Sequence, residues 1–511
     1  MTDWTAGYVT DIGYIYGCYN ELNPLRVRLA FLSAGLHFPS IGTACELGFG
    51  QGLSVNIHAA ASTVSWHGTD FNPSQAGFAQ ELAHVSGAGA QLFDDAFGEF
   101  CSRDDLPAFD YIVLHGIWSW ISDDNRATLI DFVRRKLKIG GVFYISYNTQ
   151  QGWAATVPLR ALLTEHAEML AAPADRVVNR IDAALEFADR LFKTNPLYAL
   201  DNPLVAERLK LLKKQNRNYL AHEYFNKDWH PMLFSEMAKW LAPTKLSYAC
   251  SAHYFQHIDI LNLTSEQSAF LKEIPDLIFR ETVRDFMTSQ QFRRDYWVRG
   301  ARKLNPLEQL ELLRAQRVIL TSERSAVSLK VAGALDEVLL SEEIYNPILD
   351  VLSDHQPKAL GEIEQVLSNK RITLPTLLQT AMMLTGAGYL ELAQDEHVTS
   401  QVKPRTDKLN AHLIHKARGS GEINFLASPV TGTGVAVSRF QQLFLQAIRE
   451  GREHPVDWAQ FAWQIISAQG ELIRKDGKVL ESIEENISEL NSQAQEFAVQ
   501  RLSVLKALQI F

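Results

Sequence analysis

A glycine-rich turn near the start of the chain constrains its fold more than any other feature. Residues 46–52 read Glu-Leu-Gly-Phe-Gly-Gln-Gly and follow a run of small residues at 43–45. Glycine lets a backbone turn tightly and approach a ligand closely, because it has no Cβ atom. We expect a short buried strand, the turn itself, and then a helix over 53–61. The alternative is a turn that only reverses the chain.

A second strand and an acid follow at the spacing of a nucleoside site. Residues 64–70 predict a strand that ends in Asp70, which lies 18 residues after Gly52. A glycine turn, a helix, a strand and a terminal carboxylate form a βαβ unit whose acid bonds ribose hydroxyls. The glycine spacing differs from Gly-x-Gly-x-x-Gly, and no Lys-Ser or Lys-Thr pair follows it. A nucleotide phosphate is therefore not the favoured ligand.

Length and composition narrow the class of protein. A chain of 511 residues exceeds what one hydrophobic core usually serves, so we expect about three or four domains. The N-terminus lacks a basic region followed by an apolar run, and no apolar stretch reaches the roughly 18 residues of a membrane span. The four cysteines lack CxxC or zinc spacing, which favours small core residues in a reducing cytoplasm and no metal site.

The charge is unevenly distributed along the chain. The formal net charge is −10, and residues 1–150 hold 15 Asp and Glu against 8 Lys and Arg. An acidic face attracts a cationic substrate or cofactor and repels nucleic acid, although a merely solvated acidic surface gives the same count. Residues 331–400 hold 11 acids and 3 basic residues, the reverse of a phosphate-binding surface. We expect protein contact there and no nucleic-acid partner.

Aromatic and polar clusters follow two of the later predicted strands. Strands expected over 90–94, 109–115 and 141–147 continue the alternating pattern of a doubly wound α/β sheet. In such a sheet, ligands bind beyond the carboxyl ends of the strands. The clusters at 115–120, His-Gly-Ile-Trp-Ser-Trp, and at 147–153, Tyr-Asn-Thr-Gln-Gln-Gly-Trp, are therefore expected to form a pocket. Ordinary core packing is the alternative for a single tryptophan.

These motifs resemble a known family. A glutamate that leads a glycine run without phosphate-binding residues resembles motif I of the class I S-adenosylmethionine methyltransferases. Residues 115–120 and 147–153 are similar to the HGxxSW and YNTxxGW signatures of bacterial methyltransferases that carry a methyltransferase regulatory domain. One departure is Phe49, where cysteine is the commoner residue.

Weaker similarities extend the resemblance over most of the chain. Residues 220–225 and 231–237 are similar to a HEY…YFxEF element of that family, and 292–296 to its RxFRxxL strand. The overall layout, including the segment 424–432, resembles the rickettsial protein-lysine methyltransferases.

The resemblance implies a cofactor set and an acceptor set of residues. Glu46 would order the glycine turn or balance the amino group of S-adenosylmethionine, Asp70 would hold the ribose, and Asp95 the adenine. The implied cofactor set is Glu46, Gly48, Phe49, Gly50, Gly52, Asp70, Phe71, Asp94, Asp95 and His115. The implied catalytic and acceptor set is His115, Trp118, Trp120, Tyr147, Asn148 and Tyr16.

An aromatic segment precedes the first strand of the sheet. It contains Tyr8, Tyr14, Tyr16 and Tyr19, and it either folds over the cofactor as a lid or packs as ordinary core.

The pattern of helices and strands, together with the resemblance, predicts how the chain is divided. We expect a Rossmann-like, seven-stranded catalytic domain over 1–155 and 230–305, interrupted by a helical insertion over 156–229. The insertion either forms a homodimer contact or caps only its own chain. A winged-helix-like regulatory domain over 306–400 and an α+β domain over 401–511 would follow.

The expected function is methyl transfer from S-adenosylmethionine to lysine side chains of a protein, with S-adenosylhomocysteine as product. A lysine must first lose a proton whose pKa is ordinarily about 10.4, and burial against aromatic rings lowers that pKa. Two alternatives remain open: a small-molecule N- or O-methyltransferase, and a nonenzymatic scaffold that binds S-adenosylmethionine.

Overall fold

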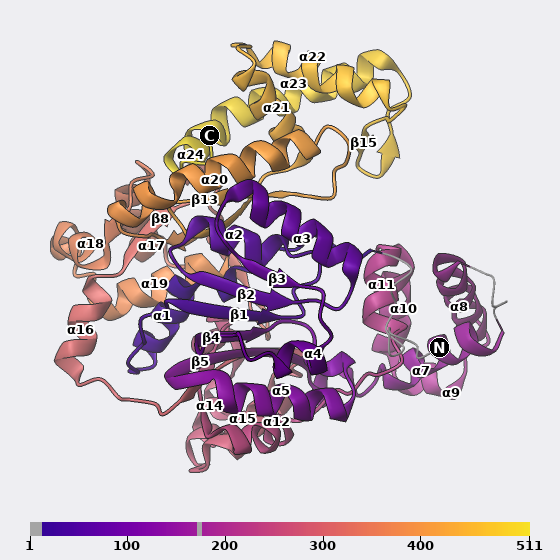
Figure 1. Ribbon diagram of the computed structural model, residues 1–511, viewed down its shortest axis with the longest axis vertical. Coiled ribbons are helices and arrows are strands. Elements are labelled where there is room, and N and C mark those ends of the chain that lie inside the picture. Colours follow the sequence, from indigo (N-terminus) through magenta and orange to yellow (C-terminus); the bar gives the residue numbers. More distant parts are fainter. Residues whose placement is uncertain (1–12, 171–175) are drawn as a thin grey trace.

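A seven-stranded mixed sheet organises the structure, a computed structural model that describes residues 13–170 and 176–511 (Figure 1). The strand order is β3-β2-β1-β4-β5-β7-β6, and β7 runs antiparallel to both of its neighbours. The strands are β1 (Thr43–Leu47), β2 (Ser65–Thr69), β3 (Gln91–Phe93), β4 (Phe109–Leu114), β5 (Leu137–Asn148), β6 (Leu246–Ser251) and β7 (Phe292–Arg299). The predicted seven-stranded α/β sheet is confirmed.

Both faces of this sheet are covered, as expected for a parallel sheet built from crossover helices. Side chains alternate along β4: Tyr111 and Val113 join one hydrophobic cluster, whereas Ile112 and Leu114 join another on the opposite face. The helices connected to these strands are α1 (Pro24–Ser33), α2 (Leu53–Ala61), α3 (Pro73–Ser86), α4 (Phe97–Ser102), α5 (Asp123–Lys136), α6 (Gln150–Trp153) and α12 (Phe234–Leu241).

Local sequence signals set several helix ends. The Asn23 side chain accepts a hydrogen bond from the Leu25 amide at 3.0 Å, and Pro24 occupies the first turn of α1. Ser122 caps α5, with Oγ accepting a hydrogen bond from the Asn125 amide at 3.3 Å. Acids in the first turn of α5 and basic residues in its last turn interact favourably with the helix dipole.

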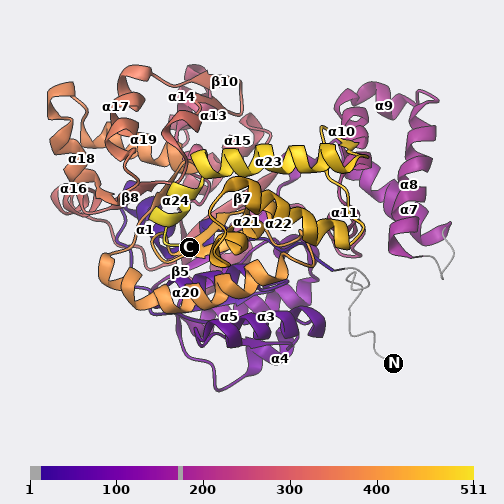
Figure 2. The same ribbon diagram turned by 90° about the horizontal axis from the view of Figure 1, so that it is seen from above.

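Five helices form a separate group beside the sheet, visible on one side in both views (Figures 1 and 2). They are α7 (Val157–Met169), α8 (Val177–Phe192), α9 (Leu197–Asp201), α10 (Pro203–Lys214) and α11 (Arg217–Tyr224). Their buried side chains, among them Leu185 and Tyr224, form a separate hydrophobic cluster together with Trp153 of α6. Pro196 and Pro203 stand at the starts of α9 and α10, because proline lacks the amide that a helix interior requires.

The chain then returns to the sheet and continues into a region of helices and two small antiparallel sheets. Short helices α13 (Asp259–Asn262), α14 (Ser265–Lys272) and α15 (Leu277–Met287) join β6 to β7. Next come α16 (Pro306–Arg314), β8 (Arg317–Leu320), β9 (Lys330–Ala332), β10 (Glu337–Leu339), α17 (Glu342–Leu352), β11 (Lys358–Ala359), α18 (Leu360–Val366), α19 (Leu374–Gly386) and β12 (Leu390–Leu392). Strands β11, β8 and β12 form one antiparallel sheet.

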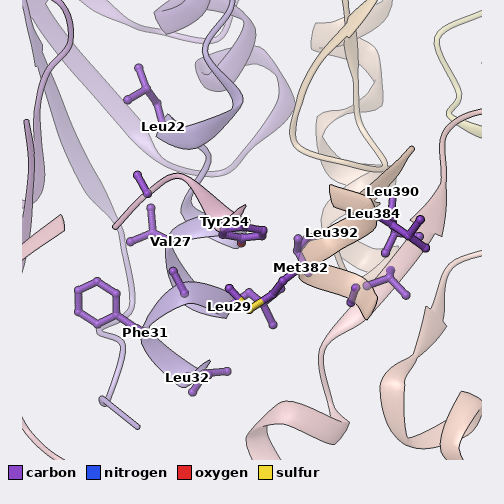
Figure 3. Close-up of a cluster of buried hydrophobic side chains, with 14 of the residues drawn as sticks. Leu22, Val27, Leu29, Phe31, Leu32, Tyr254, Met382, Leu384, Leu390 and Leu392 are labelled. Carbon is purple, nitrogen blue, oxygen red and sulfur yellow. The ribbon is translucent and has the colours of Figure 1, made fainter. Parts of the chain in front are cut away.

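This region shares its hydrophobic core with the seven-stranded sheet. Leu29 and Phe31 of α1 belong to the same cluster as Met382 of α19 and Leu392 of β12 (Figure 3). An ion pair between Arg26 of α1 and Glu391 of β12 joins the same two elements, and both side chains are largely buried. The two regions are therefore fastened by apolar packing and by a charged contact.

The last part of the chain covers α2 and α3. It contains α20 (Glu396–Lys416), β13 (Phe425–Ser428), β14 (Thr433–Ala436), α21 (Arg439–Arg449), α22 (Pro455–Ala468), β15 (Arg474–Lys475), β16 (Lys478–Val479), α23 (Ile483–Gln500) and α24 (Leu502–Ala507). Helix α20 packs against α2 and α3, and β13 and β14 pack against α2. All nine residues of α2 are buried as a result. No helix in the described ranges combines the length and hydropathy of a membrane crossing.

Candidate functional site

The glycine turn between β1 and α2 is a tight, left-handed segment. Gly48, Gly50 and Gly52 have φ angles of +74°, +59° and +68°, a region that side chains with a Cβ atom rarely adopt. A Cβ atom on Gly52 would lie 2.3 Å from the Cβ atom of Ala79, and one on Gly48 would lie 2.7 Å from the Ile117 side chain. Both the torsion angles and the lack of space require glycine here.

A cavity of about 260 Å³ lies beside this turn, at the carboxyl ends of β1, β2 and β4. The part of its lining that follows these strands includes the glycine turn, Asp70, Phe71, Asp95, His115 and Trp120. The neighbouring strands β1 and β4 carry chain connections that run in opposite directions across the sheet, which is where open α/β sheets bind ligands.

Two buried acids, Glu46 and Asp70, stand at the floor of the cavity. Burial, together with the nearby charge of Asp70, raises the pKa of Glu46 to about 8. Oε2 of Glu46 is buried and has no hydrogen-bond partner among the described residues. Burial also raises the pKa of Asp70 to about 7, although the amides of Gly50 and Asn72 donate to its oxygens at 2.8 and 3.1 Å. A cationic ligand would stabilise both carboxylates.

The lining as a whole is acidic. Five carboxyl side chains line the cavity: Glu46, Asp70, Asp95, Glu223 and Asp228. Within the described part of the chain, no lysine or arginine lines it. Burial lowers the pKa of His115, which also lines the cavity, to about 4, so this imidazole is neutral near pH 7. The cavity therefore favours a positively charged ligand over an anionic one.

The N-terminal aromatic segment contributes one wall. Tyr14 and Tyr19 line the cavity, whereas Tyr16 lies outside its lining and packs against Phe78, with 5.1 Å between ring centroids. The Tyr19 ring lies against His115 at 3.7 Å between centroids. The Tyr14 carbonyl accepts a hydrogen bond from the Gln51 side chain at 3.2 Å, which ties this wall to the glycine turn. Tyr8 lies outside the described residues.

Helix α11 and the loop after it supply another wall. His222, Glu223, Asn226 and Asp228 line the cavity. The Tyr14 hydroxyl donates to Oε1 of Glu223 at 3.4 Å, and the Tyr14 ring meets the His222 ring edge-on at 5.0 Å. Sequence reasoning gave these residues no role in the site. The signal was present in the segment 220–225, but it served there only as a mark of family resemblance.

The structure brings most of the expected cofactor set together. Glu46, Gly48, Phe49, Gly50, Gly52, Asp70, Phe71, Asp95 and His115 line one cavity, and Asp94 does not. Asp95 forms an ion pair with Arg103 at 3.0 Å, and its carbonyl accepts from the Thr69 hydroxyl.

The acceptor set is placed differently from the expectation. Trp120 and His115 line the cavity, but Trp118, Tyr147 and Asn148 do not. Trp118 is fully buried in the core on one face of the sheet, and its Nε1 donates to the sulfur of Met232 at 3.2 Å. The turn at 118–120 directs alternate tryptophans to the core and to the cavity, a choice that the sequence does not reveal.

Strand β5 is longer than expected and carries two of these residues into the interior. It continues to Asn148, one residue beyond the expected end, and the side chains of Tyr147 and Asn148 are both buried. The Tyr147 hydroxyl donates to the buried Asp295 at 3.1 Å, beside Arg293. The backbone amide of Asn148 donates to Ser119 Oγ at 2.8 Å. Both residues stabilise the carboxyl end of β5, an interior strand of the sheet, and lie outside the cavity lining.

Comparisons with known proteins agree with this geometry. Residues 216–299 match the family model of a predicted methyltransferase regulatory domain. This match begins just before α11 and ends with β7, so it includes the α11 wall and the last two strands of the sheet. An uncharacterised protein of Synechocystis is 41% identical over 512 residues, which cover 99% of each chain.

More distant relatives share the fold. An uncharacterised protein of Rickettsia prowazekii is 23% identical over 442 residues, which cover 78% of this chain and 76% of that one. The solved structure of PKMT2 from Rickettsia typhi in complex with AdoHcy superimposes with a TM-score of 0.69 and 17% identity. That likeness covers 97% of this chain and 99% of PKMT2.

Proposed function

Because the chain belongs to the class I S-adenosylmethionine methyltransferases that carry a methyltransferase regulatory domain, we propose that it methylates lysine side chains of a protein. One observation carries the proposal: a cavity at the glycine turn with five carboxyl side chains and, within the described residues, no basic one in its lining. Both S-adenosylmethionine, with its sulfonium and ammonium groups, and a lysine ammonium are cations that such a cavity attracts.

The residues at the glycine turn fit this cofactor. The glycines leave room for close approach of a ligand to the backbone, and Asp70 ends β2 where a ribose is held in this fold. Glu46 has a buried oxygen with no hydrogen-bond partner in the described part of the chain, and an ammonium group would satisfy it. We assign the ribose to Asp70, the amino group to Glu46 and the adenine side to Asp95. The bound AdoHcy of the similar PKMT2 structure supports the assignment of this cofactor class.

The cofactor supplies an electrophilic methyl group, and transfer needs little covalent help from the protein. The chain's own residues must align the acceptor nitrogen, exclude water and take up a proton. Trp120 and Tyr19 offer aromatic surface in the cavity, which attracts an ammonium group and excludes water. His115 is neutral and hydrogen-bonded to the Tyr144 hydroxyl at 2.8 Å, so it presents no competing positive charge.

The remaining proposals concern assembly and location. Leu197, Leu200 and Leu204 on α9 and α10 are between 61% and 78% exposed, which supports a homodimer through the helical insertion. The region 306–400 is proposed as a winged-helix-like protein-contact domain, and 401–511 as a C-terminal α+β domain. A cytoplasmic location agrees with four free cysteines that form no disulfide within the described residues.

Calorimetric titration of S-adenosylmethionine and S-adenosylhomocysteine tests the cofactor. We expect Asp70→Ala to weaken binding by about 1–3 kcal/mol, the usual effect of losing a charged hydrogen-bond partner. Asp94→Ala is the matched control, because this acid lies outside the cavity lining and should leave binding unchanged. Absence of binding to the wild-type chain would overturn the methyltransferase assignment.

Transfer of a labelled methyl group to a cell lysate tests the acceptor class. We expect the label in protein and in acid-stable methyl-lysine after hydrolysis. Label that remains entirely in the small-molecule fraction would overturn the protein-lysine assignment and favour a small-molecule methyltransferase.

A further inference from the structure

Glu223 is one of two acids in the cavity, with Asp228, that have no part in the assigned cofactor binding. It does not belong to the sheet or to the glycine turn: it lies on α11, the last helix of the insertion. The Tyr14 hydroxyl, at 3.4 Å, is a distant partner for a carboxylate. No lysine or arginine forms an ion pair with Glu223 within the described ranges. A carboxyl group that is largely withdrawn from water, without a basic partner, is costly to ionise unless a cation is brought to it.

Tyr14 places Glu223 next to the glycine turn. A Cβ atom built on Gly50 would lie 3.5 Å from the Tyr14 ring, and the hydroxyl at the far end of that ring contacts Glu223. The Tyr19 ring, which lies against His115, lines the same cavity as Glu46 and Glu223. Glu223 therefore faces the region between the glycine turn and the residues that follow β4.

We infer that Glu223 receives the cationic nitrogen of the methyl acceptor beside the reacting centre, so that the acceptor of this enzyme is an amine and not a hydroxyl. This inference rests on the proposed methyltransferase function and deepens it. A neutral hydroxyl acceptor would leave the Glu223 carboxylate without a counter-charge, whereas an ammonium group would satisfy it. The insertion thereby supplies acceptor chemistry to a cofactor site that the sheet builds.

Glu223 can also accept the proton that the acceptor nitrogen must lose. Burial raises the pKa of Glu223 to about 7, which suits a group that accepts a proton near neutral pH. The ammonium gives one proton to Glu223. The nitrogen lone pair then forms the N–C bond as the C–S bond breaks, and the electron pair of that bond stays on sulfur. The positive charge moves from sulfur to nitrogen, and Glu223 later returns its proton to water.

Other titratable groups surround Glu223 and must be considered in any pH profile. They come from its own helix, from the N-terminal segment, from β1 and from the loop after α11: Tyr219, His222, Tyr224, Tyr14, Tyr19, Glu46 and Asp228. Burial raises the pKa values of Tyr19, Tyr219 and Tyr224, so these phenols stay neutral near pH 7. Glu46 is the competing carboxyl group, and the test must separate it from Glu223.

Binding of sinefungin distinguishes the effect of Glu223 from that of Glu46. Sinefungin is an analogue of S-adenosylhomocysteine in which a carbon replaces the sulfur and carries a primary ammonium in the position of the transferred methyl group. Both ligands have the same α-amino group, so a contact with Glu46 affects them equally. Calorimetric titrations at pH 8, where Glu223 is mainly ionised, should show that Glu223→Gln weakens sinefungin tenfold or more and S-adenosylhomocysteine less than twofold.

Two further variants control for charge and folding. Glu207→Gln makes the same chemical change at an exposed position of the insertion and should alter neither affinity. Glu223→Asp keeps the charge and should restore part of the preference for sinefungin. Equal weakening of both ligands by Glu223→Gln, or no weakening of either, would overturn the inference. Failure of both ligands to bind the wild-type chain would instead refute the proposed function, and the inference would fall with it.

Discussion

The two sides of the cavity are built in different ways. The glycine-turn side, residues 46–52 with Asp70, comes from one βαβ unit that is continuous in sequence. The α11 side, made of His222, Glu223, Asn226 and Asp228, reaches the same cavity from more than 150 residues later. Local torsion angles and one strand pairing define the first side. The α11 side forms only because the insertion packs against the N-terminal segment. Substitutions on the α11 side can therefore leave the glycine turn undisturbed.

The largest effect is expected between the two tryptophans that follow β4. Trp118→Ala should lower the free energy of unfolding by about 3–5 kcal/mol, because it removes a fully buried ring from the core. Trp120→Ala should cost less stability, since one side of this ring faces the cavity, and it should mainly weaken acceptor binding. Urea unfolding and acceptor KM measure the two effects. Equal stability losses would contradict the different placement of these rings.

A substitution in the glycine turn should destabilise the glycine-turn side of the cavity and prevent cofactor binding there. We expect Gly52→Ala to destabilise the chain by about 3 kcal/mol and to abolish cofactor binding, because alanine adds both a strained φ angle and a collision with Ala79. Gly87→Ala is the matched control. Its φ angle is +65°, but its Cβ atom would meet nothing within 4 Å, so only about 1 kcal/mol should be lost. Similar losses in both variants, measured by urea unfolding, would show that space beside the turn does not matter.

The pH dependence of the free energy of unfolding should reveal the buried Glu46 carboxyl group on the glycine-turn side of the cavity. The pKa of Glu46 is about 8 in the folded chain and 4.5 in its ordinary range, so between these values the folded chain holds more protons than the unfolded one. The free energy of unfolding should therefore fall as pH rises, by about 3 kcal/mol between pH 5 and pH 8.

Glu46→Gln should flatten this dependence, and denaturant titrations over that pH range measure it. Some slope should remain, because the raised pKa of Asp70 acts in the same direction. An identical slope in the wild type and in Glu46→Gln would exclude Glu46 as the titrating group. A saturating cationic ligand should also reduce the slope, since it favours the ionised carboxylates.

The smallest effect is expected where the two sides meet. Tyr14→Phe removes a hydroxyl that lies 3.4 Å from Glu223 and keeps the ring beside Gly50. We expect a loss of about 0.5–1 kcal/mol in acceptor or sinefungin binding and no change in S-adenosylhomocysteine binding. Calorimetry distinguishes these outcomes. A larger loss for S-adenosylhomocysteine would mean that Tyr14 serves the cofactor and not the α11 side.

The sequence predictions were accurate for features that neighbouring residues determine and less accurate for placements that depend on contacts between distant segments. The glycine turn and the strands beside it could be predicted, because they depend on residues that are neighbours in the chain, whereas the complete seven-stranded sheet was expected from the family resemblance. The acceptor residues were harder, because the same aromatic motif places one tryptophan in the core and another in the cavity. The division into domains remains a prediction, since one hydrophobic core joins the sheet to the region after it.

The sequence by itself determined the βαβ unit with its glycine turn and Asp70, because torsion angles, missing Cβ atoms and hydrophobic alternation are local properties. Only the tertiary structure decided that Glu223 stands beside that turn and that Tyr147 does not. The physical reason is that these placements depend on packing between distant segments. The insertion carries α11 to Tyr14, and the pairing of β5 with β7 brings Asp295 to the Tyr147 hydroxyl.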